Sequence, residues 1–192
     1  MTRFINNLKS ESTPEALNIK FFTIESPNGE PIINSYILVN GKMYRVRSEM
    51  LVFDKRLEKI YAEKKDKATQ YGIKANIPGG SAEPNRSLKE QAILEVAEEA
   101  EISVKNVEYT GVKIIKAYEK YPKWQIEVLW PKGYRYEGCC TFIFTAIIDK
   151  KIQRVKTASD DDHENAKKYK FYKPEELGLD DIRLNIIKQY KE

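Results

Sequence analysis

A tight Pro-Gly-Gly turn followed by a capped helix is the feature that most limits how this chain can fold. The turn, Pro78–Gly80, interrupts regular structure, since two adjacent glycines accept backbone angles that side chains forbid. Ser87, with Glu90 three residues later, forms a capping box, which predicts that a helix begins at about Leu88. No glycine or proline follows before position 100, and apolar residues recur every fourth position: Leu88, Ala92 and Val96. The pattern predicts a helix whose apolar face packs on a sheet.

The predicted helix carries three closely spaced glutamates. Glu95 lies three residues before Glu98 and four before Glu99, so the three carboxylates share one helix face. Like charges so placed repel one another, and a hard cation such as Mg²⁺ would neutralise them while also binding substrate phosphates. The alternative is a solvated acidic face, which is common in a chain with 29 Asp and Glu residues. The spacing alone leaves both interpretations open.

The stretch from position 77 to 102 resembles the Nudix box, the signature of the Nudix hydrolase superfamily. That signature is a glycine, five residues, a glutamate, seven residues, and then Arg-Glu-hydrophobic-x-Glu-Glu-x-Gly-hydrophobic. With Gly80 as the first glycine, the Glu95-x-x-Glu98-Glu99 core is intact and Ile102 is the closing hydrophobic residue. Three positions depart from the signature, which has glutamate, arginine and glycine where this chain has Arg86, Leu94 and Glu101.

The resemblance implies what these departures mean. In the family, the first glutamate and the arginine form a structural ion pair, and here both are missing together. Their joint loss indicates that the structural support of the box has changed, rather than that the metal site is lost. The resemblance covers roughly positions 50 to 177.

The resemblance also implies a fold. We expect an α+β protein, an α/β/α sandwich with a mixed β-sheet. Residues 49–192 would form the Nudix-like catalytic domain, with an aromatic insert at 118–138 and a C-terminal helix. Residues 1–48 would form an N-terminal extension that contains a β-hairpin. Such an extension is reminiscent of dimeric ADP-ribose-type members, so a homodimer is one expectation.

The function that the resemblance implies is hydrolysis of a pyrophosphate bond by metal-activated water. Its substrate would be a nucleoside diphosphate linked to another moiety, with ADP-ribose or a related nucleotide sugar as the first expectation. The cofactor would be Mg²⁺ or Mn²⁺, held by Glu95, Glu98, Glu99 and the backbone carbonyl of Gly79. Glu98 or Glu164 would be the general base.

Glu164 is chosen by its place late in the chain. A polar, acidic loop is predicted at 157–165, and the stretch after it leads from an aromatic strand through proline to Glu-Glu-Leu, as in many Nudix domains. In several of those enzymes a glutamate in this loop is the general base or an extra metal ligand. Glu164 is the best match and Asp162 the second, and a solvated acidic loop is the alternative.

A β-hairpin with an Asn40-Gly41 turn is predicted upstream, with strands over 35–39 and 42–47. Arg45 and Arg47 alternate onto one face of its second strand, where they would bind substrate phosphate or form a solvated sheet face. Lys74, just before the Pro-Gly-Gly turn, is either a further phosphate contact or a free surface lysine.

Further elements follow from hydrophobic patterning. We expect strands over 18–24, 50–53, 59–63 and 107–118, and an amphipathic helix over 180–191. The run at 139–149 is nearly all apolar, which predicts a central strand buried on both faces, with Cys139 and Cys140 as small core residues.

The insert at 118–138 contains both tryptophans, Trp124 and Trp130, among lysines and an arginine. Such a segment can stack a base and meet a phosphate. Internal packing of the aromatic residues, or a dimer interface, explains the composition equally well.

The composition of the chain limits the kinds of partner and compartment that we expect for it. The net charge of +4 suits a small anionic substrate without demanding nucleic acid, and we see no apolar run long enough for a membrane helix or a signal peptide. Two adjacent cysteines provide no disulfide framework, so we expect a cytoplasmic protein; the single histidine excludes a multi-histidine metal site.

Two other functions stay open. One is a catalytically inactive, Nudix-like nucleotide-binding module, because Arg86, Leu94 and Glu101 depart from the signature. The other is a single-stranded nucleic-acid-binding protein that uses the basic, aromatic insert. The absence of a dense basic patch or a known binding motif argues against nucleic acid.

Overall fold

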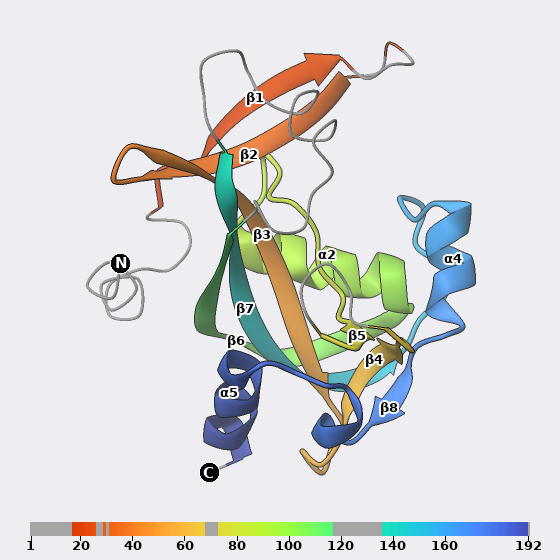
Figure 1. Cartoon of the computed structure of the whole chain (residues 1–192). Helices are drawn as coiled ribbons and strands as arrows, with labels where there is room; N and C mark the ends of the chain where they lie inside the picture. The colour runs from red at the N-terminus through yellow and green to blue at the C-terminus, as the bar shows by residue number, and fades with distance from the viewer. Residues whose placement is uncertain (1–16, 26–28, 30, 68–72, 117–135, 192) are drawn as a thin grey trace.

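The long strand β3 (Lys42–Phe53) is the strand around which the sheet is arranged (Figure 1). The computed structural model describes residues 17–25, 29, 31–67, 73–116 and 136–191. β3 pairs antiparallel with β2 in its first part and with β4 at its end, and it pairs with β7 in parallel along most of its length. The strands are β1 (Lys20–Glu25), β2 (Pro31–Val39), β3, β4 (Ile60–Lys64), β5 (Ala75–Asn76), β6 (Ile102–Lys116), β7 (Tyr136–Lys151) and β8 (Lys170–Tyr172).

The helices lie on both sides of this sheet. They are α2 (Leu88–Ala100), α4 (Asp160–Ala166) and α5 (Asp181–Lys191), with a short 3-10 turn η3 (Pro174–Glu176). Alternate residues of β3 enter two different cores: Met50 and Val52 pack with the apolar face of α2, whereas Leu51 and Phe53 pack with α5. The expected α/β/α sandwich with a mixed sheet and added N-terminal strands is therefore confirmed.

The predicted hairpin is confirmed, but its second strand is longer than expected. Asn40 and Gly41 have φ of 52° and 74°, as a two-residue turn of the primed kind requires. The strands predicted at 42–47 and 50–53 form the single strand β3, because Ser48 and Glu49 are buried and paired with β7 rather than forming a polar break. β3 thus runs through the expected domain boundary at 48/49.

The apolar run near position 140 forms the central strand predicted for it. β7 lies between β3 and β6, and residues 139–146 are all buried. Cys139 and Cys140 are core residues with free thiols, and burial raises the pKa of each.

Of two predictions for the C-terminal part, one needs correction and one is confirmed. The acidic loop expected at 157–165 contains helix α4, because Ser159 and Asp162 form a capping box of the same kind as that of α2. The predicted C-terminal helix is present as α5, and Arg183 is completely buried on it beside Ile186 and Ile187. Burial of Arg183 was missed because an arginine does not count toward an apolar face.

Some predictions lie outside the described residues, namely those for the first sixteen residues and for most of the insert, including Trp124 and Trp130. In the described part of the chain, no helix has the length and apolar character needed to cross a bilayer.

Candidate active site

The helix that carries the glutamates begins as predicted. Ser87 Oγ accepts a hydrogen bond from the Glu90 amide at 3.2 Å, and a Glu90 carboxylate oxygen accepts one from the Ser87 amide at 2.8 Å. Leu88, Ala92, Val96 and Ala100 are buried against the sheet, which leaves the carboxylates of Glu95, Glu98 and Glu99 on a neighbouring, half-buried face.

The helix ends at Glu101, where the Nudix signature has glycine. Glu101 adopts left-handed backbone angles (φ 51°, ψ 43°), which glycine takes freely and other residues take at a cost of about 1–2 kcal/mol. Its carboxylate accepts a short hydrogen bond from the ring of His163 on α4. Glu101 therefore takes backbone angles that suit glycine, and its side chain adds a contact between α2 and α4.

The Pro-Gly-Gly loop lies antiparallel along the middle of β3. The amide of Met50 donates to the Pro78 carbonyl at 3.0 Å, that of Ser48 to the Gly80 carbonyl at 2.9 Å, and that of Ala82 to the Val46 carbonyl at 3.2 Å. The loop therefore occupies a strand position in the sheet between β2 and β4.

Arg45 and Arg47 also contact this loop. Arg47 Nη2 donates to the Gly79 carbonyl at 2.5 Å, and Arg45 Nη2 donates to Ser81 Oγ at 2.5 Å. Both arginines are half-buried, so a freely solvated sheet face is the wrong description of them. The structure brings them to the loop that precedes the glutamate helix.

Both loop glycines are required by close packing. A Cβ on Gly79 would lie 2.4 Å from the Ser48 carbonyl oxygen, and a Cβ on Gly80 would lie 1.8 Å from Glu95 Oε1. Any side chain at either position would push the loop away from β3 or the carboxylate away from the loop.

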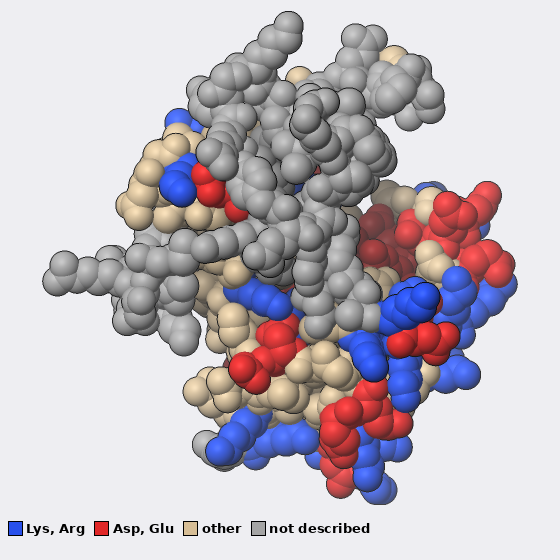
Figure 2. Space-filling model, in the orientation of Figure 1, with Lys and Arg blue, Asp and Glu red and all other residues tan. Residues whose placement is uncertain are grey.

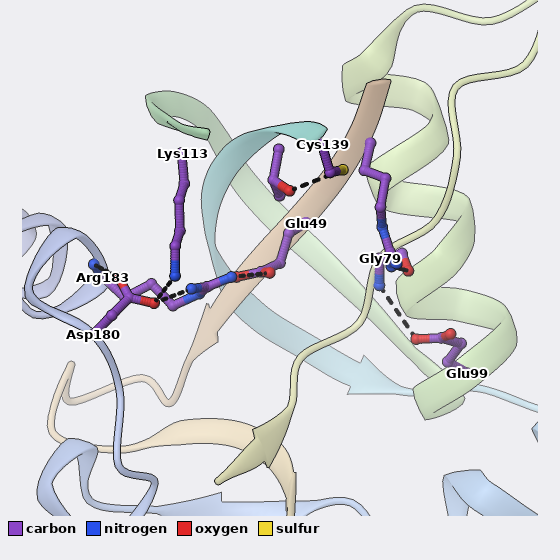
Figure 3. Close-up of polar contacts among 9 residues, drawn as sticks. Glu49, Gly79, Glu99, Lys113, Cys139, Asp180 and Arg183 are labelled. Atoms are coloured by element: carbon purple, nitrogen blue, oxygen red, sulfur yellow. Dashed lines mark hydrogen bonds and ion pairs between the residues drawn. The ribbon is translucent and has the colours of Figure 1, made fainter. Parts of the chain in front are cut away.

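Two of the three carboxylates have defined partners. Glu99 Oε2 accepts a hydrogen bond from the Gly79 amide at 3.2 Å (Figure 3) and one from the hydroxyl of Tyr169 at 3.4 Å. Glu95 Oε1 accepts one from Gln91 Nε2 at 2.8 Å. Sequence reasoning missed Tyr169 and Gln91; the four-residue spacing from Gln91 to Glu95 is a usable helix signal, whereas nothing local indicates Tyr169.

The environment opposes ionisation of these carboxylates. Burial, and after it the charge of Glu95, raise the pKa of Glu99 to about 7. Burial likewise raises the pKa of Glu95, and the neighbouring charge of Glu98 acts in the same direction. The site thus concentrates acidic groups, and the charge of Arg47 offsets only part of the effects that oppose their ionisation.

A divalent cation fits this donor set. Mg²⁺ and Mn²⁺ prefer carboxylate and carbonyl oxygens, and a cation would relieve the repulsion among Glu95, Glu98 and Glu99. Within the described ranges, no three His, Cys, Asp or Glu side chains already lie together as an ion would need. Glu95 accepts from Gln91 through Oε1 and Glu99 accepts from the Gly79 amide through Oε2, so the second oxygen of each carboxylate is left for an ion.

The other predicted residues lie apart from this cluster. Glu164 is exposed on α4, and Lys167 donates to it at 2.5 Å, which lowers its pKa. Asp162 caps α4 through Ser159, and its charge contributes to the raised pKa of Glu99. Lys74 is exposed and its side chain lies against Gly178. The structure does not bring Glu164 or Lys74 into contact with the three glutamates.

A cavity of about 580 Å³ opens between β2 and the loop after Gly80, and Glu95 forms part of its wall. This volume is in the range of small-molecule sites. Its walls combine apolar and charged side chains: Pro31, Ile33, Ser81, Ala82, Glu83, Pro84, Asn85, Arg86 and Glu95. The N-terminal strands therefore contribute directly to the candidate site.

A buried charge network lies on the other side of β3 from Glu99 (Figure 3). Arg183 of α5 donates to both carboxylate oxygens of Glu49, with Nε at 2.6 Å from Oε1, and also pairs with Asp180. Lys113 Nζ donates to Asp180 at 2.7 Å. Two cations and two anions balance, so the network anchors α5 to β3 without leaving a net buried charge.

Surface charge is mixed on the face drawn in Figure 2. Over its described part, Lys and Arg side chains lie interspersed with Asp and Glu, most densely at the lower right. This distribution does not form the continuous basic track that a nucleic-acid backbone requires.

The chain is similar to solved structures of other proteins. A NUDIX hydrolase from Nitrosomonas europaea is 16% identical, with 77% of this chain and 88% of that chain covered and a TM-score of 0.49. A MutT protein from Bacillus halodurans is 19% identical, with 77% and 82% covered and a TM-score of 0.49. The NUDIX domain of Shewanella oneidensis NrtR, solved with ADP ribose, is 14% identical, with 76% and 85% covered and a TM-score of 0.45. No family model and no curated protein matches the chain.

Proposed function

We propose that this chain is a Nudix-type hydrolase that cleaves a phosphoric anhydride bond in a nucleoside diphosphate linked to another moiety, with a divalent cation. The observation that carries the proposal is the half-buried cluster of Glu95, Glu98 and Glu99 against the glycine loop. Burying unneutralised carboxylates lowers stability, so their arrangement is best explained by a cation that binds there.

The proposed ligands are the carboxylates of Glu95, Glu98 and Glu99 and the carbonyl oxygen of Gly79. A carbonyl oxygen has two lone pairs, so the bond from Arg47 leaves one of them for a cation. When bound, Mg²⁺ or Mn²⁺ would neutralise the diphosphate and lower the pKa of a water molecule.

The proposed base is Glu98, which takes the proton of the water that attacks phosphorus. The bond from phosphorus to the bridging oxygen breaks, and the leaving phosphate keeps that oxygen. Glu164 is the second candidate. To act as the base, it would have to break its hydrogen bond with Lys167 and turn toward the substrate. Because Glu98 lies on the face of α2 that carries Glu95 and Glu99, it needs no such rearrangement.

The cavity next to Glu95 is the proposed position of the organic part of the substrate. Pro31 and Ile33 provide apolar groups in its lining, and Arg86 and Asn85 provide polar groups. ADP-ribose or a related nucleotide sugar is the first candidate. Lys74, Trp124 and Trp130 are proposed further contacts to phosphate and base. A homodimer and a reducing, cytoplasmic location are also part of the proposal; both cysteines are free.

The test is a hydrolysis screen with Mg²⁺ over ADP-ribose, NAD⁺, dinucleoside polyphosphates and nucleoside triphosphates. We expect turnover of at least one substrate, and a loss of about 100-fold or more in kcat for Glu98→Gln and Glu99→Gln. Glu90→Gln is the matched control, since Glu90 is an exposed glutamate on the same helix. No turnover of any substrate, or equal turnover by wild type and both site variants, would refute the proposal.

A second candidate, an inactive nucleotide-binding module, is favoured by one observation: Glu95 and Glu99 already have internal partners. It predicts that ADP-ribose binds with the same affinity with and without Mg²⁺ and is not consumed. Calorimetry with product analysis by chromatography distinguishes the two functions.

A further inference from the structure

The loop that precedes the glutamate helix has an unusual set of anchors. Besides the backbone bonds to β3, two guanidinium groups from the same strand reach it: Arg47 at the Gly79 carbonyl and Arg45 at Ser81 Oγ, each at 2.5 Å. Charged donors make stronger hydrogen bonds than neutral ones, so these two bonds add considerably to the backbone pairing.

The Gly79 peptide connects this anchor to the site. Its carbonyl oxygen accepts from Arg47, and its neighbour Ser48 would collide with any Cβ at Gly79. The amide nitrogen of Gly79 donates to Glu99 Oε2. A guanidinium on one side of Gly79 is therefore linked, through one residue, to a carboxylate of the site on the other side.

Arg86 and Leu94, at two of the three altered positions of the Nudix box, do not provide this support. Arg86 pairs with Glu83, three residues before it, within the exposed part of the loop. Leu94 is a half-buried apolar residue on α2 and can make no ion pair. An ion pair between positions 86 and 94 is thus excluded. Apart from the hydrogen bond between the Gly79 amide and Glu99, the described contacts that hold Gly79 and Ser81 come from β3.

We infer that Arg47 and Arg45 are positioning residues: from β3 they fix the Gly79–Ser81 loop so that the Gly79 amide holds Glu99 in place. The predicted effect on catalysis rests on the proposed function. The support that the two arginines give to the loop, called the brace below, can be measured without substrate. It assigns the arginines a role different from direct contact with a substrate phosphate.

The two roles predict different kinetics. A phosphate contact made equally in the ground state and the transition state would raise KM when removed and leave kcat unchanged. A brace acts on the geometry of Glu99, so its loss should lower kcat and weaken Mn²⁺ binding, with KM changed little. Loss of groups that orient metal ligands typically weakens metal affinity by about 10- to 100-fold.

The experiment compares the full-length wild type with Arg47→Met, Arg45→Met and Ser81→Ala, and with Arg56→Met as a control at an exposed arginine of the β3–β4 turn. Amide hydrogen exchange is followed by NMR, Mn²⁺ binding by calorimetry, and hydrolysis by steady-state kinetics. We expect Arg47→Met to speed exchange of the Gly79 amide by about tenfold or more, since a charged hydrogen bond is lost. Arg47→Lys, which keeps a charged donor, should recover part of the protection.

Arg45 has its own test, which stands even if Arg47→Met fails to fold. Because Arg45 and Ser81 act through one bond, the double variant should weaken Mn²⁺ binding no more than the stronger single variant. Fully additive effects would overturn the assignment for Arg45. Unchanged Gly79 exchange in Arg47→Met, or a raised KM at constant kcat, would overturn it for Arg47. If the wild type neither binds Mn²⁺ nor hydrolyses any substrate, the proposed function is refuted instead. Hydrogen exchange of the Gly79 amide still shows whether Arg47 holds the loop.

Discussion

Replacing Glu99 with glutamine should make the protein more stable at alkaline pH while removing its activity. The wild-type carboxyl has a pKa of about 7 in the folded protein and an ordinary value of 4.5, because burial and the charge of Glu95 oppose its ionisation. Glutamine keeps a carbonyl oxygen for the bond from the Gly79 amide but carries no charge. The variant therefore avoids the cost of burying a carboxylate.

The sign and size of the stability difference between Glu99→Gln and wild type follow from proton linkage. Between pH 4.5 and 7 the folded state holds a proton on Glu99 that the unfolded state has lost, so wild-type stability falls as the pH rises through this window. The difference in the free energy of unfolding between Glu99→Gln and wild type should grow by roughly 2–3 kcal/mol from pH 5 to pH 8. In a chain of this length, that corresponds to roughly 5–10 °C in Tm.

Urea denaturation at several pH values measures this difference, and comparing two pH values cancels any pH-independent effect of the substitution. Saturating Mg²⁺ at pH 8 should stabilise the wild type and have less effect on the variant. Glu90→Gln is the matched control: hydrogen bonds from Ser87 lower the pKa of Glu90 from 4.5, so its loss should destabilise the protein by an amount that stays constant from pH 5 to 8 and shrinks only as the pH falls below 4.5. A difference between Glu99→Gln and wild type that stays flat from pH 5 to 8 would refute the burial argument.

Three further substitutions test the packing around the site. Gly80→Ala should displace the flexible end of Glu95 and weaken Mn²⁺ binding in calorimetry with little change in Tm, whereas Gly79→Ala meets the backbone of β3 and should lower Tm clearly. Arg183→Met should destabilise the protein by about 3–5 kcal/mol in urea denaturation, since Glu49 is left buried without its cation. Ser87→Ala removes the cap of α2 and should cost about 1 kcal/mol in the same assay; equal stability with the wild type would contradict the capping assignment.

Local signals in the sequence were sufficient for α2, the hairpin and the central strand. A capping box, an Asn-Gly turn and an unbroken apolar run each act over a few residues, so the structure that they favour does not depend on distant partners. The capping pattern of Ser159 and Asp162 is an equally local signal for α4, although the dense acidic residues around it are also typical of a solvated loop.

Contacts between residues distant in sequence could not be predicted from such local signals. The partners of Arg45 and Arg47 lie more than thirty positions away, at Ser81 and Gly79, and alternation along a strand indicates only which face the arginines share. Tyr169 reaches Glu99 from seventy positions away. Arg183 is buried only because Glu49, on another element, supplies a carboxylate. In each case, charge or polarity suggested exposure, and a partner distant in sequence made burial possible.

The continuity of β3 limits which changes in chain length this protein can accept. Successive side chains of a strand point to opposite sides, so inserting or deleting one residue between Arg47 and Met50 would reverse one half of the strand relative to the other. Either the arginines would turn away from the glycine loop, or Leu51 and Phe53 would turn away from α5. Changes of two residues would keep the faces but shift the pairing with β7. Related chains should therefore vary in length at the Asn40-Gly41 turn and in the β3–β4 turn, and hardly at all between them.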